Sequence, residues 1–265
     1  MFRLFNNFKT LLVFCSLLSL IAIFALPAES WAESSASVQE EAAEEEATPK
    51  PWEEEEYATL PEPRLADPFQ PVNRVMFAFN DKLYLYVLKP IGQGYAAVFP
   101  QPVRIGVDNF FYNLRYPVRF VNDILQAKII RAGKETTSFL LNTIFGFAGL
   151  LKPAQEVSWL SPAPSEEDTG QTLGTWGFGP GFYIVWPVLG PSSLRGSVGK
   201  VGDYFLDPLN YVEPYNLQIG LSAGERVNSV SLRLGEYEDL KEAALDPYIA
   251  FKDAYYQYRQ KLLEE

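Results

Sequence analysis

The sequence has 265 residues, of which 48% are hydrophobic and 15% aromatic, and its formal net charge is −11. This length suits one large domain with short appendages. Cys15 is the only cysteine and histidine is absent, which excludes disulfides within the chain, the usual base of a hydrolytic triad and the commonest zinc ligand. No cofactor or metal is expected.

The first 32 residues have the pattern of an export signal. Two cations flank an apolar run at residues 11–26, and small residues follow it. A membrane-spanning helix is the alternative, but this run is shorter than the roughly 20 residues that a span needs. Phe14 precedes Cys15, where a lipid-attachment signal would need a small residue. We therefore expect a cleaved signal peptide over residues 1–32 and no lipid anchor.

Residues 33–64 form an acidic segment that is rich in Glu, Ala, Pro and Ser. Residues 33–56 carry ten glutamates against one lysine, whereas residues 57–265 have a net charge of only −3. The segment has too few large apolar side chains to offset the loss of conformational entropy on folding. A flexible tether is therefore predicted. An acidic arm for a basic partner is the alternative.

The chain changes character at Asp67, and a helix is predicted to begin there. Asp67 followed by Pro68 is typical of an N-cap with proline in the first turn. Apolar residues then recur at three- and four-residue spacing, which predicts an amphipathic helix: Phe69, Val72, Val75, Met76 and Phe79. The polar residues Asn73, Arg74 and Asn80 fall on its other side.

Two short helices are predicted over residues 100–125, with Pro117 opening the second. The next segment, 128–151, has an apolar face running from Ile129 to Ala148, opposite a face marked by Lys128, Arg131, Lys134 and Glu135. From residue 139 to 151 the polar face disappears. These 13 residues are too few to span a bilayer, so they form either a core helix, which is the favoured interpretation, or a helix at membrane depth.

Residues 168–196 are interrupted by seven glycines and three prolines, which exclude a long helix. A hairpin-like loop with a short strand at residues 182–189 is predicted. The glycine spacing does not match a dinucleotide or phosphate-binding loop. At the end of the chain, Asp246 and Pro247 predict the start of a last helix bearing Ile249, Phe251, Tyr255 and Tyr258.

No catalytic constellation is found, and we expect no enzyme. Acids that could form a hydrolytic pair have no diagnostic spacing, and solvated charge is the favoured interpretation: Glu135, Glu156, Glu166, Glu167 and Asp168. Nucleic-acid binding is not expected, because the body is slightly acidic and its aromatic residues alternate with aliphatic ones. The profile is typical of a monotopic or lipid-handling protein.

Six stretches in fixed order resemble the MlaA (VacJ) family of Gram-negative bacteria over about residues 65 to 260. They are DPFQPVNRVMFAFND, PQPVRIGVDNFFYNL, FLLNTIFGFAGLL, EDTGQTLGTWGFGPGFYIVWPVLGPSSLRG, GDYFLDPL and DPYIAFKDAYYQYR. The resemblance implies a mainly α-helical, ring-like domain over residues 65–265 with a central amphipathic channel and a Gly/Pro-rich hairpin-like loop. It also implies a position in the inner leaflet of the outer membrane.

The implied activity is phospholipid transport. Such proteins remove mislocalised phospholipids from the outer leaflet and pass them to a periplasmic carrier, which maintains lipid asymmetry, and they commonly sit beside trimeric porins. By motif position, the resemblance suggests residues that line or position the channel: Asn73, Phe77, Phe79, Asn80, Asn109 and Asn113. It suggests a gating loop with these residues: Gly174, Gly177, Gly179, Gly181 and Tyr183.

Three features depart from the family pattern. The leader has no lipobox, Gly196 stands where an acid commonly follows Leu194 and Arg195, and the tether is atypically acidic. Two alternatives remain. One is a soluble periplasmic scaffold or binding protein whose aromatic stripes form a core, and the other is an acid-pair hydrolase.

Overall fold

The computed structural model describes residues 65–160 and 166–264. The predicted signal peptide and tether lie outside the described residues. The helices are α2 (Gln70–Leu83), α3 (Lys89–Val98), α4 (Gln101–Leu114), α5 (Tyr116–Leu125), α6 (Ile129–Ile144), α7 (Thr169–Thr175), α8 (Leu194–Leu206), α9 (Tyr215–Leu232), α10 (Glu236–Ala243) and α11 (Pro247–Glu264). The other elements are a π-helical segment η2 (Tyr84–Leu88), two 3₁₀ turns, η3 (Pro153–Glu156) and η4 (Pro208–Tyr211), and two strands, β1 (Tyr183–Trp186) and β2 (Gly190–Ser193).

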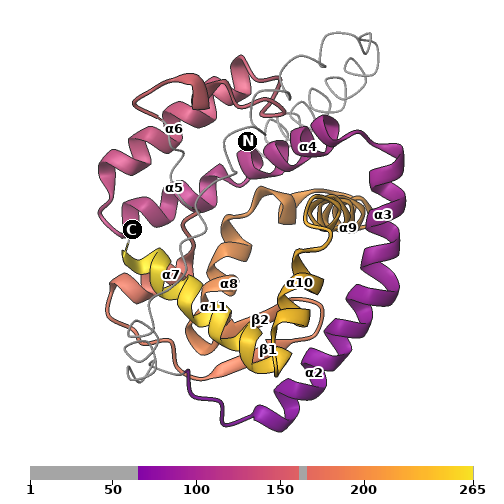
Figure 1. Ribbon diagram of the computed structural model, residues 1–265. Helices are drawn as coiled ribbons and strands as arrows, with labels where there is room; N and C mark the ends of the chain where they lie inside the picture. Colours follow the sequence, from indigo (N-terminus) through magenta and orange to yellow (C-terminus); the bar gives the residue numbers. More distant parts are fainter. Residues whose placement is uncertain (1–64, 161–165, 265) are drawn as a thin grey trace, which may run out of the picture. The chain divides into compact units, whose positions relative to one another are not determined.

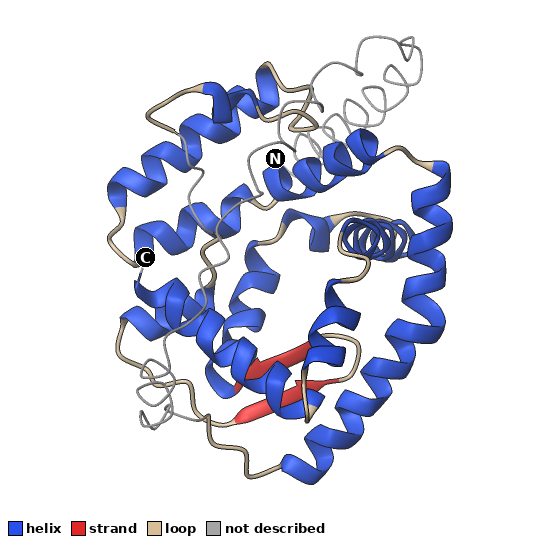
Figure 2. Ribbon diagram, viewed as in Figure 1, coloured by secondary structure: helices blue, strands red, loops and turns tan. Residues whose placement is uncertain are grey.

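The predicted helical fold class is confirmed, as is the hairpin. Within the described unit, α2, α3 and α4 follow one another along its edge, α5 continues them with α6 on its outer side, and α8, α9 and α10 lie inside (Figure 1). Helix α9 packs against both α3 and α4, and α5 packs against α6 and α7. The two strands lie near α2, α8 and α11 (Figure 2). The predicted pair of short helices on either side of residue 115 is also present as α4 and α5.

The helix α2 starts two residues later than predicted. The helix begins at Gln70, with Pro71 in its first turn and no side chain capping it. Asp67 is engaged elsewhere, because its carboxylate accepts hydrogen bonds from the Asn73 Nδ2 (2.8 Å) and from the Tyr248 hydroxyl. The Asp67 side chain therefore bonds these two side chains and does not form the helix cap that the sequence pattern predicts.

Glycines allow α7 and α8 to approach closely. A Cβ added at Gly199 would lie 2.4 Å from the backbone nitrogen of Gly170, and one at Gly202 would lie 2.7 Å from the Thr169 side chain. Helix α7 begins with a capping box, in which Asp168 accepts from the Gln171 backbone N–H and the Gln171 side chain accepts from the Asp168 N–H. Glycine here serves helix packing, which agrees with the absence of a nucleotide-binding pattern.

The strands β1 and β2 pair antiparallel, with Tyr183 opposite Ser193 and Trp186 opposite Gly190. Residues 187–189 form the tip. Val188 adopts φ 67°, a left-handed conformation that β-branched residues rarely adopt, and Gly190 follows with φ 79°. Contacts outside the hairpin must therefore hold the tip in this conformation.

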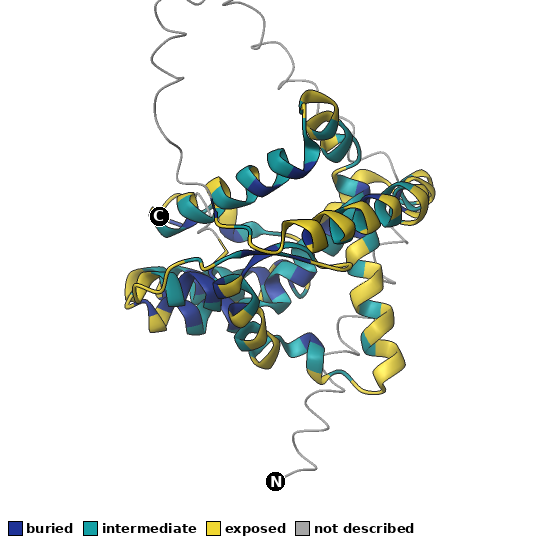
Figure 3. Cartoon of the chain, turned by 90° about the horizontal axis from the view of Figure 1, so that it is seen from below, coloured by how far each residue is buried: buried dark blue, intermediate teal, exposed yellow. Residues whose placement is uncertain are grey.

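The burial pattern is inverted relative to a water-soluble protein. Among the described residues, 18 polar or charged side chains are buried against 12 hydrophobic ones, while 36 large hydrophobic residues are exposed. Buried positions gather where elements meet, and exposed positions run along whole helices (Figure 3). Soluble monomers rarely expose contiguous apolar surface on this scale, so these faces need a partner other than water.

Helix α6 shows the inversion most clearly and corrects the predicted faces. Its buried residues are Ala132, Glu135 and Asn142, whereas Ile130 and Ile144 are 82% and 67% exposed. The helix ends at Ile144, so the favoured core helix over residues 139–151 is also wrong. The apolar stripe faces outward because Arg119, from α5, binds Glu135 and draws the other face inward.

Candidate functional site

Asn73 and Asn80 on α2 hold the hairpin through their side-chain amides. The Asn73 Nδ2 donates to the Tyr183 carbonyl (3.0 Å), and its Oδ1 accepts from the Val185 N–H (2.9 Å). Two turns further along, the Asn80 Nδ2 donates to the Trp186 carbonyl (2.9 Å), and its Oδ1 accepts from the Val188 N–H (2.7 Å). The two amides thus satisfy β1 and the tip as an adjacent strand would.

The two asparagines that hold the hairpin differ in burial. Asn73 is 2% exposed, whereas Asn80 is only partly buried and binds the strained tip. Asn73 therefore positions the hairpin from within the packing and cannot line an open passage as predicted. Its spacing from Asn80 in the sequence is seven residues, two helical turns, but sequence alone does not show which backbone the amides bind.

An apolar groove runs between α2 and β1. Its volume is 360 Å³, and it is lined by Phe69, Val72, Asn73, Met76, Phe182, Ile184, Val185, Trp186 and Pro187. Because the Asn73 amide is bonded to backbone on both sides, the groove presents almost no free polar group. Phe69 and Val72 are 50% and 57% exposed on its wall. The apolar face of α2 that the residue spacing predicted is therefore directed outward.

Residues 144–151 form a tight protrusion that we call the apolar knob. Its exposed side chains are Ile144, Phe145, Phe147 and Leu151. Gly149 has φ 95°, and a Cβ there would lie 2.4 Å from the Cβ of Asn113. The Asn109 Nδ2 donates to the Leu150 carbonyl (3.2 Å), and the Asn113 Nδ2 donates to the Thr143 hydroxyl (2.9 Å). The two asparagines predicted to line a channel thus support the knob.

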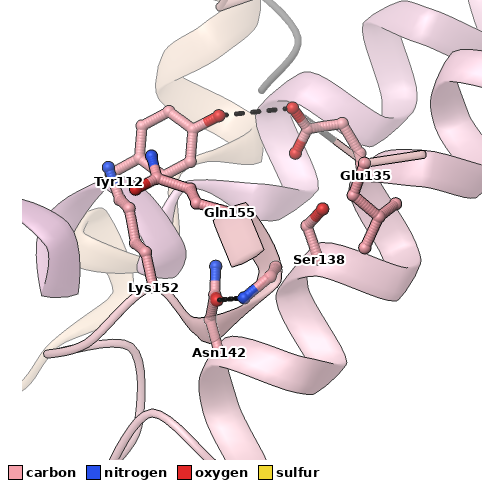
Figure 4. A pocket seen from close by; sticks show the side chains of 8 residues that line it. Tyr112, Glu135, Ser138, Asn142, Lys152 and Gln155 are labelled. Atoms are coloured by element: carbon pink, nitrogen blue, oxygen red, sulfur yellow. Dashed lines mark hydrogen bonds between the residues drawn. The ribbon is translucent and has the colours of Figure 1, made fainter. Parts of the chain in front are cut away.

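A small cavity of 20 Å³, room for one water molecule, lies at the base of the knob (Figure 4). The Tyr112 hydroxyl donates to Glu135 Oε1 (3.3 Å) at its edge, and Asn142 Oδ1 accepts from the Ala154 N–H (3.1 Å). The Lys152 ammonium lies 4.2 Å from the centroid of the Tyr112 ring and, among the described residues, has no ion pair. Burial lowers the pKa of Lys152. Because no acidic residue occurs from 136 to 155, Lys152 is the only charge in that stretch.

Four buried charges and the part-buried Arg131 join α5, α6 and the segment before α7. Arg119 Nε lies 3.1 Å from Glu135 Oε2, and Arg131 contacts both Asp123 (3.2 Å) and Glu167 (3.0 Å). Glu135 and Glu167 are each 2% exposed, so the prediction that they are solvated is wrong. Both are buried because arginines from neighbouring elements compensate them. Glu156 and Glu166 are exposed, as predicted.

The residues of the predicted gating loop are spread over different environments. Gly174 lies in α7 against Arg195, and Gly181, with φ 72°, lies against Leu194. Gly177 and Gly179 have open space around them. Tyr183 is fully buried in a core cluster with Leu65, Val185 and Tyr248, so it cannot form part of an open gate.

The two predicted phenylalanines also separate. Phe77 packs edge-on against Tyr248 (5.8 Å between ring centroids) and near Phe251 (5.5 Å), whereas Phe79 is 49% exposed. Only Phe79 is therefore available to an external partner.

Sequence reasoning missed the exposed stripe on α8. It comprises Leu194, Val198, Val201 and Phe205, which are between 42% and 64% exposed. Their three- and four-residue spacing was available in the sequence and would have predicted an amphipathic helix. Figure 1 places α8 inside the outer helices, so its apolar stripe lies in the inner part of the unit.

No helix among the described residues combines the length and the apolar content that crossing a bilayer requires. The exposed apolar faces belong instead to short helices and to the knob. Such elements can bury an apolar face to partial depth in one leaflet.

Comparison with known proteins places this geometry in a family. The MlaA lipoprotein family matches residues 65–262. The chain is 31% identical over 193 residues to the "Intermembrane phospholipid transport system lipoprotein MlaA" of Escherichia coli K12, which covers 72% of this chain and 76% of that protein. The corresponding protein of Haemophilus influenzae is 31% identical over 201 residues, covering 73% and 78%.

A solved structure agrees with these relatives. It is described as "Structural basis for maintenance of bacterial outer membrane lipid asymmetry" and superimposes with a TM-score of 0.66 at 30% identity, covering 75% of this chain and 99% of that one. Sequence and fold therefore agree over the same part of the chain. This protein belongs to the MlaA lipoprotein family.

Proposed function

We propose that this protein is an outer-membrane phospholipid transport protein. It removes mislocalised phospholipids from the outer leaflet and thereby maintains lipid asymmetry. The inverted burial pattern carries the proposal, because 36 exposed large hydrophobic residues and a polar interior suit a protein whose solvent is partly lipid. The names of the relatives support the same activity. A soluble scaffold with its aromatic stripes packed inward does not fit this pattern.

The protein sits on the periplasmic side of the outer membrane, with its apolar faces in the inner leaflet. The knob and the outward stripe of α6 supply such a face, and Lys152 stands at the knob's base where a lipid phosphate would lie. Export occurs by a cleaved signal peptide over residues 1–32. An acidic tether over residues 33–64 precedes the transport domain over residues 65–265.

Phospholipid passes through an amphipathic channel between the inner helices. The exposed stripe of α8 supports a route for acyl tails, and the hairpin that Asn80 holds supplies the movable element. Gly177 and Gly179 give the loop before β1 its freedom to move, since nothing packs against them. No covalent chemistry takes part. The lipid leaves to a periplasmic carrier protein, and a trimeric porin is the neighbour in the membrane.

Lipid that co-purifies with the full chain tests this function. We expect the protein to remain with membranes in high salt, to be released by detergent, and to carry phospholipid identifiable by mass spectrometry. Recovery as a lipid-free protein without detergent would contradict the proposal. Turnover of a substrate that is abolished by changing one carboxylate would instead support a hydrolase.

Changing Asn80 to alanine is expected to alter lipid passage more than stability. The variant frees the Val188 N–H and the Trp186 carbonyl at a partly exposed site, at a cost of about 1 kcal/mol in the free energy of unfolding. The amount of phospholipid in the outer leaflet should nevertheless change, because the tip is no longer held.

Asn73→Ala is the matched control. It leaves two backbone groups unpaired inside the packing and should lower the free energy of unfolding by about 2–5 kcal/mol. Phe79→Ala removes an exposed ring from the residue of α2 that precedes Asn80 and should also change the outer-leaflet lipid. Unchanged outer-leaflet phospholipid in both the Asn80 and the Phe79 variant would count against a role for the tip in transport.

A further inference from the structure

Arg195, in the first turn of α8, is a buried cation without a counter-ion. It is 7% exposed. Its Nη1 donates to the Phe178 carbonyl (2.8 Å), while its Nε is buried with no hydrogen-bond partner. In the part of the chain that the structure describes, no carboxylate lies within ion-pair distance of Arg195. Arg119, which is similarly buried, has Glu135 as a partner.

The surroundings of Arg195 add positive charge. Arg259, from α11, is near enough to lower the pKa of Arg195 as the second cause after burial, and Tyr255 and Asp168 oppose the shift. Asp168 is already bound by both terminal nitrogens of Arg259. The first N–H groups of α8 offer no further donors, because they are bonded to the Phe182 and Pro180 carbonyls and to the Ser193 hydroxyl. One acid, Asp168, therefore faces the two guanidinium groups of Arg195 and Arg259.

An uncompensated buried guanidinium is among the most unfavourable groups a fold can hold. A planar guanidinium fork matches the oxygens of a phosphate. The residual exposure of Arg195 leaves it reachable. We propose that Arg195 is the centre of an oxyanion site at the junction of α7, α8 and α11, which binds a phosphate group, either free or as part of a phospholipid headgroup.

Thermal unfolding of the full chain in detergent tests the site. Inorganic phosphate should raise the Tm of the wild type more than chloride does at equal ionic strength, and Arg195→Met should lose most of this rise. Arg195→Lys keeps the charge and should retain part of it. If the site takes a lipid phosphate, the rise appears with phosphatidic acid in mixed micelles and not with inorganic phosphate.

A measurement in chloride separates the site from a merely structural arginine. Arg195→Met should be at least as stable as the wild type there, because it removes a buried charge that has no ion-pair partner among the described residues. Arg119→Met leaves the Glu135 carboxylate without its ion-pair partner and should have a much lower Tm than the wild type. The proposal is overturned if neither phosphate nor phosphatidic acid distinguishes the wild type from Arg195→Met, or if Arg195→Met is as unstable as Arg119→Met. The inorganic-phosphate arm does not depend on lipid transport, so the two proposals can fail separately.

Discussion

Arg119→Met is expected to lower the free energy of unfolding by about 3–5 kcal/mol. Arg119 and Glu135 are 4% and 2% exposed, and the guanidinium also donates to the Tyr112 carbonyl (2.7 Å) and stacks over the Tyr112 ring (3.8 Å). Methionine fills a similar volume but leaves the Glu135 carboxylate buried and unpaired. Denaturant unfolding in detergent measures the loss.

Arg74→Met is the control for this variant. Arg74 forms an ion pair with Asp246 at 2.7 Å, but both side chains are 42% exposed, so water replaces the pair at little cost. Equal stability of the Arg119 and Arg74 variants would show that the buried pair does not hold α5 to α6.

The stability of the wild type is expected to fall by about 2–3 kcal/mol between pH 5 and pH 8 because of Asp123. Asp123 is fully buried, and neither carboxylate oxygen has a hydrogen-bond partner. Burial raises the pKa of Asp123 to about 7; Arg131 opposes this shift, and Glu135 and Glu167 add to it.

The sign follows from the two pKa values of Asp123. The pKa in the folded chain lies above the ordinary value of 3.8, so the folded state binds more protons between them. The stability that Asp123 contributes is therefore fully present below its pKa in the unfolded chain. It is lost as the pH rises through its pKa in the folded chain. Asp123→Asn keeps the shape and cannot ionise, so its stability should vary less over this range. Parallel pH profiles for the two proteins would contradict the assignment.

The sequence predicted element types better than it predicted which face of each element is buried. Spacing of apolar residues on α2 and α6 identified two faces, and the structure keeps both patterns. Periodicity does not carry the direction, however, because a helix in contact with lipid turns its apolar face outward. That is why residues 139–151 were predicted to be core, although Phe145 and Phe147 are 67% and 61% exposed.

Long-range pairing explains the other differences. The sequence around Glu135 and Glu167 predicts that both are solvated. That prediction fails because their arginine and lysine partners lie elsewhere in the chain. Local signals succeeded where the contact is local: Asp246 does cap α11, accepting from the Tyr248 and Ile249 N–H groups. The amide of Asn73 bonds residues 110 and 112 positions away, and no spacing rule predicts such a contact.

The structure places the predicted site residues in different environments, and their role in lipid passage stays a prediction. Asn80 bonds the hairpin tip, and Phe79 lies on the exposed face of α2. Asn109 and Asn113 support the knob, and Tyr183 belongs to the core. A motif match identifies which positions carry a fold, but it does not separate those that contact a ligand from those that hold the backbone.

Outer-leaflet phospholipid is the measurement that tests the central claim most directly. It should be compared in Gram-negative cells that lack the gene for this protein and in the same cells carrying the wild-type gene. The account predicts that loss of the gene raises the phospholipid accessible at the cell surface and that the wild-type gene restores the parental level. Equal surface phospholipid with and without the protein would contradict it.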